Sequence, residues 1–149
     1  MMNEPWGYLK SGKKMRREGW RDVAFAISVP GLLSSLYLAY HALFRGTSLY
    51  CPATGSFDCN VVTSSPYSSL FGVNVAYLGL AWFLVVIALF ALERRDVLLP
   101  IWAVGVVFVA YLVGTEIFLI HSICAYCTVA HASAVLLGIP VLKLPEDEV

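Results

Sequence analysis

Long runs of apolar residues constrain the folding of this chain more than any other feature. A transmembrane helix needs about 20 consecutive apolar residues to cross a hydrocarbon core of about 30 Å. Four such runs cover residues 23–44, 71–92, 97–123 and 125–142. Only one acid, Glu116, interrupts the third run. The sequence therefore predicts a membrane domain with four spans at residues 22–143, between an N-terminal tail (1–21) and a C-terminal tail (144–149).

The hydrogen-bonding needs of the backbone inside lipid limit the possible architectures. Polar backbone groups inside lipid must be paired within the spanning structure, which leaves helices or a closed barrel. The apolar residues are continuous rather than alternating, so they favour helices. Because only the charged residues 93–96 separate the second and third spans, these two spans should be antiparallel neighbours. We expect an all-α integral membrane protein built as a bundle of four transmembrane helices.

The composition agrees with a membrane protein and excludes several other classes. Hydrophobic residues make up 59% of the chain and charged residues 13%, with a formal net charge of zero. Soluble domains carry about 25% charged residues, roughly twice as many. A disordered chain and a nucleic-acid-binding protein are excluded by the same figures, since both need far more charge.

The distribution of Lys and Arg predicts the orientation, because basic residues in short loops stay in the cytoplasm. Nine of the ten lie in the N-terminal tail, at positions 94 and 95, and after the fourth span. Only Arg45 lies on the opposite side. Both termini and the 93–96 turn are therefore expected in the cytoplasm. The loop at 45–70, between the first and second spans, is expected to be extracytoplasmic.

All four cysteines fall on this predicted outer side, in two pairs. Cys51 and Cys59 lie in the loop, and Cys124 and Cys127 lie where the fourth span begins. A Cys-x-x-Cys motif at a helix N-terminus brings two sulfurs within bonding distance, and the unpaired amides there favour a thiolate. The thiolate is the nucleophile of thiol–disulfide exchange. Two dithiol pairs on one membrane face suggest a relay in which one pair exchanges with the other.

Other interpretations of the cysteines stay open at this point. The Cys124–Cys127 motif alone also suits a zinc site or a structural bridge. Turn-forming residues lie between Cys51 and Cys59, so this pair also suits a disulfide that clamps the loop. All four sulfurs together suit zinc as well, although we favour no metal site. The corresponding alternative function is a non-enzymatic four-span protein with structural disulfides.

The cysteine pattern, with Ser64-Ser65 and Ser69-Leu70-Phe71-Gly72 before the second span, resembles the vitamin K epoxide reductase family. The resemblance covers roughly residues 23–142 and is to the prokaryotic type. It implies that Cys51 meets the thiol of a partner and that Cys59 shuttles between Cys51 and Cys124. It also implies that Cys127 faces a lipid quinone.

The resemblance further implies four quinone contacts, at Ser65, Ser68, Phe71 and His131. Ser68 and His131 stand where vertebrate members have an asparagine and a tyrosine. His131 lies one helical turn after Cys127, so the two share one helix face. A packing role for His131 is the alternative.

The resemblance implies a membrane thiol–disulfide oxidoreductase that promotes disulfide formation. Electrons would pass from a reduced thioredoxin-like or DsbA-like partner, through the two cysteine pairs, to a quinone such as ubiquinone or menaquinone. Prokaryotic members often carry a fused thioredoxin-like domain; these 149 residues contain none, so we expect a separate partner. Reduction of vitamin K epoxide or a related quinone by the same cysteines is the enzymatic alternative.

Glu116 is the one acid within a predicted span. A carboxylate inside a membrane is costly and often functional. A role in moving protons during quinone reduction is one interpretation. The other is that Glu116 is protonated, or hydrogen-bonded to a neighbouring helix.

Overall fold

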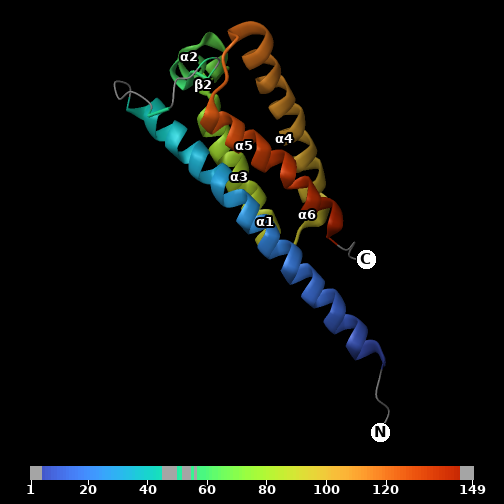
Figure 1. The fold of residues 1–149 in the computed structure, drawn as a ribbon. Coiled ribbons are helices and arrows are strands. Elements are labelled where there is room, and N and C mark those ends of the chain that lie inside the picture. Colours follow the sequence, from blue (N-terminus) through green and yellow to red (C-terminus); the bar gives the residue numbers. More distant parts are fainter. Residues whose placement is uncertain (1–4, 45–49, 52–54, 56, 145–149) are drawn as a thin grey trace.

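A computed structural model describes residues 5–44, 50–51, 55 and 57–144, and these are mainly helical (Figure 1). The bundle is formed by α1 (Pro5–Leu43), α3 (Val75–Ala91), α4 (Arg95–Thr115), α5 (Ala125–Leu136) and α6 (Gly138–Lys143). Between α1 and α3 lie α2 (Cys59–Ser64), the 3-10 turn η1 (Pro66–Ser68), and the strands β1 (Ser69–Leu70) and β2 (Val73–Asn74). A π-helical turn, η2 (Glu116–Ile120), extends α4.

Within the described residues, three helical segments are long and apolar enough to cross a membrane. They are Lys14–Leu43, Arg95–Ile120 and Ala125–Lys143, whereas α3 is apolar but has only 17 residues. Many large apolar side chains point outward; Val104, Val107 and Phe118 are 66%, 71% and 74% exposed. An outer surface this apolar requires lipid rather than water as its solvent. The prediction of an α-helical membrane protein is confirmed.

The second apolar helix begins later than predicted. Residues 69–74 form an antiparallel hairpin in which Ser69 pairs with Asn74 and Leu70 with Val73. The Asn74 side chain then accepts a hydrogen bond from the N–H of Ala76 at 2.9 Å and caps α3. Because this cap and the hairpin fix the start of α3 at Val75, residues 71–74 are not part of the helix.

The other helix ends also differ from the predicted spans. α1 runs back into the predicted N-terminal tail as far as Pro5. The third predicted span ends as a helix at Ile120, where η2 is closed by His121 in a left-handed conformation, with φ 58°. The fourth is divided at Leu137 into α5 and α6.

The bundle is closed by α4, which packs against α3, α5 and α6, while α1 runs along α3 and α5. Two indole N–H groups tie α4 to its neighbours: Trp82 donates to the carbonyl of Ile101 at 3.1 Å, and Trp102 donates to that of Ala134 at 3.0 Å. A core lies between the helices, formed by Ala24, Phe83, Val86, Phe90, Leu98, Ala134, Leu137 and Val141.

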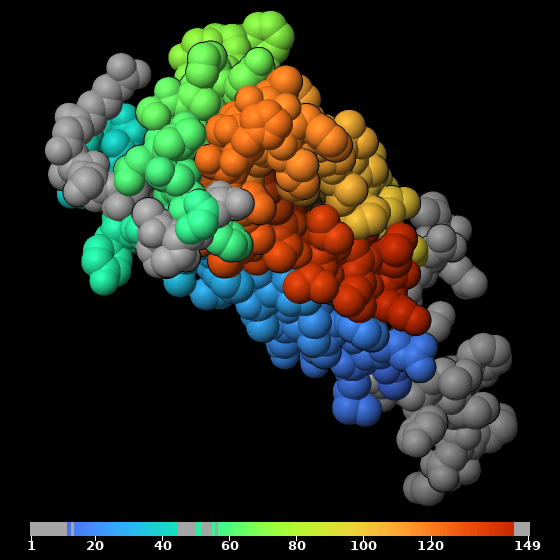
Figure 2. Space-filling view, turned by 45° about the horizontal axis from the view of Figure 1, so that its top comes forward, coloured from blue at the N-terminus to red at the C-terminus, as the bar shows by residue number. Residues whose placement is uncertain are grey.

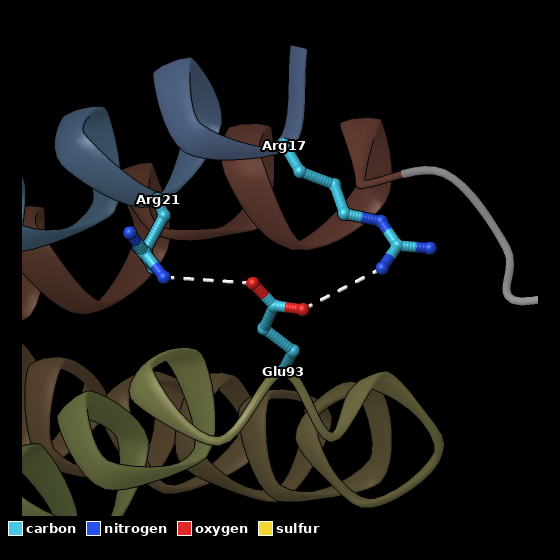
Figure 3. Close-up of polar contacts among 3 residues, drawn as sticks. All are labelled: Arg17, Arg21 and Glu93. Atoms are coloured by element: carbon cyan, nitrogen blue, oxygen red, sulfur yellow. Dashed lines mark hydrogen bonds and ion pairs between the residues drawn. The ribbon is translucent and has the colours of Figure 1, made fainter. Parts of the chain in front are cut away.

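The two ends of the bundle carry different chemistry. At one end, Arg17 and Arg21 of α1 reach the two carboxylate oxygens of Glu93, in the turn between α3 and α4, each at 3.5 Å (Figure 3). The hairpin and α2 lie at the opposite end, beside the start of α5 (Figure 1). The cysteines therefore lie at the other end of the bundle from this basic and acidic cluster.

Candidate functional site

All four cysteines meet at the end of the bundle where α5 begins. Cys51 and Cys59 form a disulfide with their Cα atoms 6.0 Å apart, and Cys124 and Cys127 are free thiols. Cys59 and Cys124 are completely buried and belong to one apolar cluster. Cys51 and Cys127 are partly buried and pack against that cluster. The structure thus brings together the four residues that the sequence analysis selected.

A backbone contact holds the two cysteine-bearing segments against each other. Phe57 and Ile123 form a parallel β-bridge, in which the N–H of Asp58 donates to the carbonyl of Ile123 at 3.1 Å. Cys59 and Cys124 follow this bridge within two residues on their own segments. Figure 2 shows the result: the green segment after residue 57 lies against the orange segment that leads into α5.

The position of Cys59 is fixed by a helix cap. The Asp58 side chain accepts hydrogen bonds from the N–H groups of Asn60 at 3.0 Å and Val61 at 3.3 Å. An aspartate in this position satisfies N–H groups that otherwise have no helical partner, so α2 starts at Cys59. The cap therefore directs Cys59 into the buried cluster.

Cys124 is the N-cap of α5, and its sulfur accepts a hydrogen bond from the N–H of Cys127 at 3.4 Å. The hydrogen bond from the Cys127 side chain, followed by that from its backbone, lowers the pKa of Cys124 against the opposing effect of burial. A lowered pKa means that Cys124 forms the nucleophilic thiolate more readily than an ordinary cysteine. The sequence predicted that this helix start favours a thiolate, and the lowered pKa of Cys124 lies in that direction.

A cavity of about 780 Å³ lies between the helices beside the cysteine cluster. Among its lining residues are Cys127 and His131 of α5, together with Ser65 and Ser68. Three of the four predicted quinone contacts therefore face one space. It lies next to one thiol of the inner cysteine pair, which is Cys124 and Cys127. Apolar side chains from α1, α3, α4 and α5 make up most of the remaining wall.

Phe71, the fourth predicted contact, is not among the residues that line this cavity. It occupies the hairpin turn with φ 52°, and its side chain is 98% exposed. Its predicted contact with a quinone stays a prediction.

Glu116 is 5% exposed and lines the same cavity. It opens the π-helical turn, and its backbone carbonyl accepts a hydrogen bond from the N–H of Ser122 at 3.2 Å. A carboxyl group, an imidazole and a thiol are therefore among the groups that line the cavity.

Several polar lining residues were not selected from the sequence, among them His41 and Asn74. His41 lies three residues after Leu38 and six after Ser35, which also line the cavity, so spacing along the first span was an available signal. Asn74 stands directly before an apolar run, which is where a helix cap is expected.

Zinc binding by all four cysteines depends on their oxidation state. Four thiolates around zinc need all four sulfurs reduced, and two of them are bonded to each other here. In the part of the chain that the structure describes, no group of three or more His, Cys, Asp or Glu side chains is arranged to hold a metal ion.

Comparison with known proteins agrees with this arrangement. The model of the vitamin K epoxide reductase family matches residues 23–142, most of the chain. The matched region contains the four cysteines, the cavity residues named above and the helices from the apolar part of α1 to the penultimate residue of α6. Membership supports a membrane oxidoreductase with redox-active cysteines. This chain belongs to the vitamin K epoxide reductase family.

Proposed function

We propose that the protein is a membrane thiol–disulfide oxidoreductase. It takes two electrons from a reduced thioredoxin-like or DsbA-like partner and passes them through its two cysteine pairs to a lipid quinone, and so promotes disulfide formation. One observation carries the proposal: Cys59 and Cys124, one from each pair, are buried in a single cluster. Two independent structural bridges would need no such contact between the pairs.

The accessibility of the two loop cysteines supports a particular order of the thiol exchanges. Cys51 is half-buried and Cys59 is completely buried, so a partner thiolate attacks Cys51. The Cys51–Cys59 bond breaks and Cys59 leaves as a thiolate. When the inner pair is oxidised, Cys59 attacks Cys124, and Cys127 leaves as a thiolate on the cavity side. Each exchange forms one disulfide and breaks another, so no further oxidant is needed.

The cavity fits a quinone in size and in chemistry. Its volume of about 780 Å³ lies within the range of about 300–1,000 Å³ that is usual for small-molecule sites, and its wall is largely apolar with a few polar groups. A bound quinone supplies an acceptor for two electrons and two protons. The thiols of Cys124 and Cys127 provide both when they form their disulfide. His131 and Glu116, on the cavity wall, can donate or accept the protons.

We also propose four spans, with both termini in the cytoplasm and the cysteines outside. The 17 residues of α3 extend about 26 Å at about 1.5 Å per residue, close to the thickness of the hydrocarbon core. The short turn that joins α3 to α4 carries Arg94 and Arg95, at the end that Arg17 and Arg21 share. Basic residues at one end of the bundle favour that end in the cytoplasm.

A turnover assay tests the proposed activity directly. Purified protein is mixed with reduced thioredoxin and a short-chain ubiquinone, and the ultraviolet absorbance of the quinone is followed. We expect steady reduction of the quinone, abolished in Cys127→Ser because the sulfur beside the cavity is lost. A wild-type protein that reduces no quinone under these conditions would contradict the proposal and favour structural disulfides.

The relay predicts a trapped intermediate. Cys51→Ala and Cys127→Ala each remove the normal partner of Cys59 or of Cys124, so both variants should accumulate a Cys59–Cys124 disulfide. Peptide mapping without reduction detects this link between the loop and α5. Cys59→Ala is the matched control, since it cannot form the bridge. If both variants lack the bridge, the relay is wrong.

The orientation is tested by labelling intact cells with a membrane-impermeant maleimide. Cys59→Ala leaves Cys51 without its disulfide partner, and we expect this thiol to be labelled from outside. The control is Leu92→Cys, at a position 69% exposed beside the turn between α3 and α4, which should be labelled only after the membrane is opened. The opposite pattern would reverse the proposed orientation.

The proposed role of His131 separates quinone reduction from thiol exchange. His131→Ala should slow quinone reduction by about 10- to 100-fold, the usual effect of losing a hydrogen bond to a charged group. Exchange between thioredoxin and Cys51, measured by alkylation, should be unchanged. His131→Tyr keeps a hydroxyl group and should retain part of the activity. A wild-type rate for His131→Ala throughout about pH 6 to 8 would assign the residue to packing alone.

A further inference from the structure

Two tyrosine hydroxyl groups meet the backbone of Tyr50, the residue directly before Cys51. The hydroxyl of Tyr126 donates to the carbonyl of Tyr50 at 2.6 Å. The N–H of Tyr50 donates to the hydroxyl of Tyr37 at 3.3 Å. The rings of Tyr37 and Tyr126 also contact each other, with centroids 4.7 Å apart. Both polar backbone groups of Tyr50 are therefore held, while its own side chain is 84% exposed.

The two tyrosines come from elements that carry the rest of the site. Tyr126 lies between Cys124 and Cys127 at the start of α5, and Tyr37 lies on α1. Both pack against the buried cluster that contains Cys59 and Cys124. The hydrogen bonds thus connect the backbone beside Cys51 to the helix that carries the inner cysteine pair, without using the disulfide.

We propose that Tyr37 and Tyr126 act as positioning residues that hold Cys51 close to Cys59 while the Cys51–Cys59 disulfide is open. This inference rests on the proposed relay and adds a step to it. The second thiol of the partner attacks the partner–Cys51 disulfide, so the partner leaves with its own disulfide and Cys51 is released as a thiol. With Cys59 bonded to Cys124, this free Cys51 thiol must return to Cys59. The hydrogen bonds to Tyr50 keep Cys51 within reach during that interval.

The step that they favour is a balanced exchange. The thiolate of Cys51 attacks the sulfur of Cys59, the Cys51–Cys59 bond forms, and the Cys59–Cys124 bond breaks. Cys124 leaves with the electron pair as a thiolate, which accepts the hydrogen bond from the N–H of Cys127. Exchange within one chain is faster when the attacking group is held in place, so loss of the hydrogen bonds should slow this step.

The test compares Tyr126→Phe and Tyr37→Phe with the wild type. Each variant keeps the ring and loses one hydroxyl group. Tyr40→Phe is the matched control: it removes a hydroxyl group from the same helix as Tyr37, on a side chain that is 55% exposed. Turnover is started with reduced thioredoxin and a short-chain ubiquinone, stopped with an alkylating agent, and the protein is mapped for the Cys59–Cys124 disulfide.

We expect Tyr37→Phe and Tyr126→Phe each to hold about three to five times more Cys59–Cys124 disulfide during turnover than the wild type, as the loss of one neutral hydrogen bond implies. Tyr40→Phe should match the wild type. Wild-type levels of the Cys59–Cys124 disulfide in both Tyr37→Phe and Tyr126→Phe would overturn the proposal. If Cys51→Ala forms no bridge either, the relay itself fails, which is a different outcome.

A second measurement covers variants that fold poorly in the assay. In Cys124→Ala/Cys127→Ala protein, the loop disulfide is equilibrated with reduced and oxidised glutathione. Adding Tyr126→Phe should lower the equilibrium constant for the loop disulfide by about three- to fivefold, and adding Tyr40→Phe should leave it unchanged. An unchanged constant with Tyr126→Phe would also overturn the proposal, because Cys51 would then be held by something else.

Discussion

The site depends on one backbone contact, the bridge between Phe57 and Ile123. The two residues are far apart in sequence, and the hydrogen bond from Asp58 to Ile123 is 3.1 Å long. It places the start of α2 against the segment before α5, so that a cysteine of each pair becomes buried in the same cluster. Exchange between the pairs needs this proximity, because one sulfur can attack another only at bonding range. The fold of the loop is therefore a condition for any chemistry that links the two pairs.

The way the chain passes from α4 to α5 prepares the second half of that contact. The π-helical turn Glu116–Ile120 changes the helical register, and His121, with φ 58°, reverses the chain direction. Non-glycine residues rarely adopt this conformation, and π-helical turns often occur at functional sites. The result places Glu116 on the cavity wall and leaves Cys124 in an extended conformation as the cap of α5. The backbone conformation before α5 therefore determines that the sulfur of Cys124 accepts the hydrogen bond from the N–H of Cys127.

The sequence was sufficient to predict the features that depend on hydropathy and on cysteine spacing. The apolar runs located α1, α4 and α5, and the Cys-x-x-Cys motif located the start of α5 within one residue. The hairpin at 69–74 was missed because Leu70, Phe71 and Val73 continue the apolar run, although turn geometry and the Asn74 cap stop the helix there. Local patterns point to His41 and Asn74 separately, but the fact that both line one cavity depends on how distant helices pack, which a local pattern does not contain.

The polar groups of the cavity divide into donors and acceptors. The Ser65 hydroxyl donates to the carbonyl of Val62 at 2.8 Å, and the Ser68 hydroxyl donates to that of Ser65 at 2.7 Å. With its single hydrogen committed, each hydroxyl offers only lone pairs to the cavity. The carbonyl oxygens of a quinone need donors, which the Asn74 amide and the His131 ring possess, whereas the hydroxyl groups of the reduced form can donate to the serines. Under the proposed function, the serine hydroxyl groups would accept hydrogen bonds from the reduced form, and His131 and Asn74 would donate to the oxidised form.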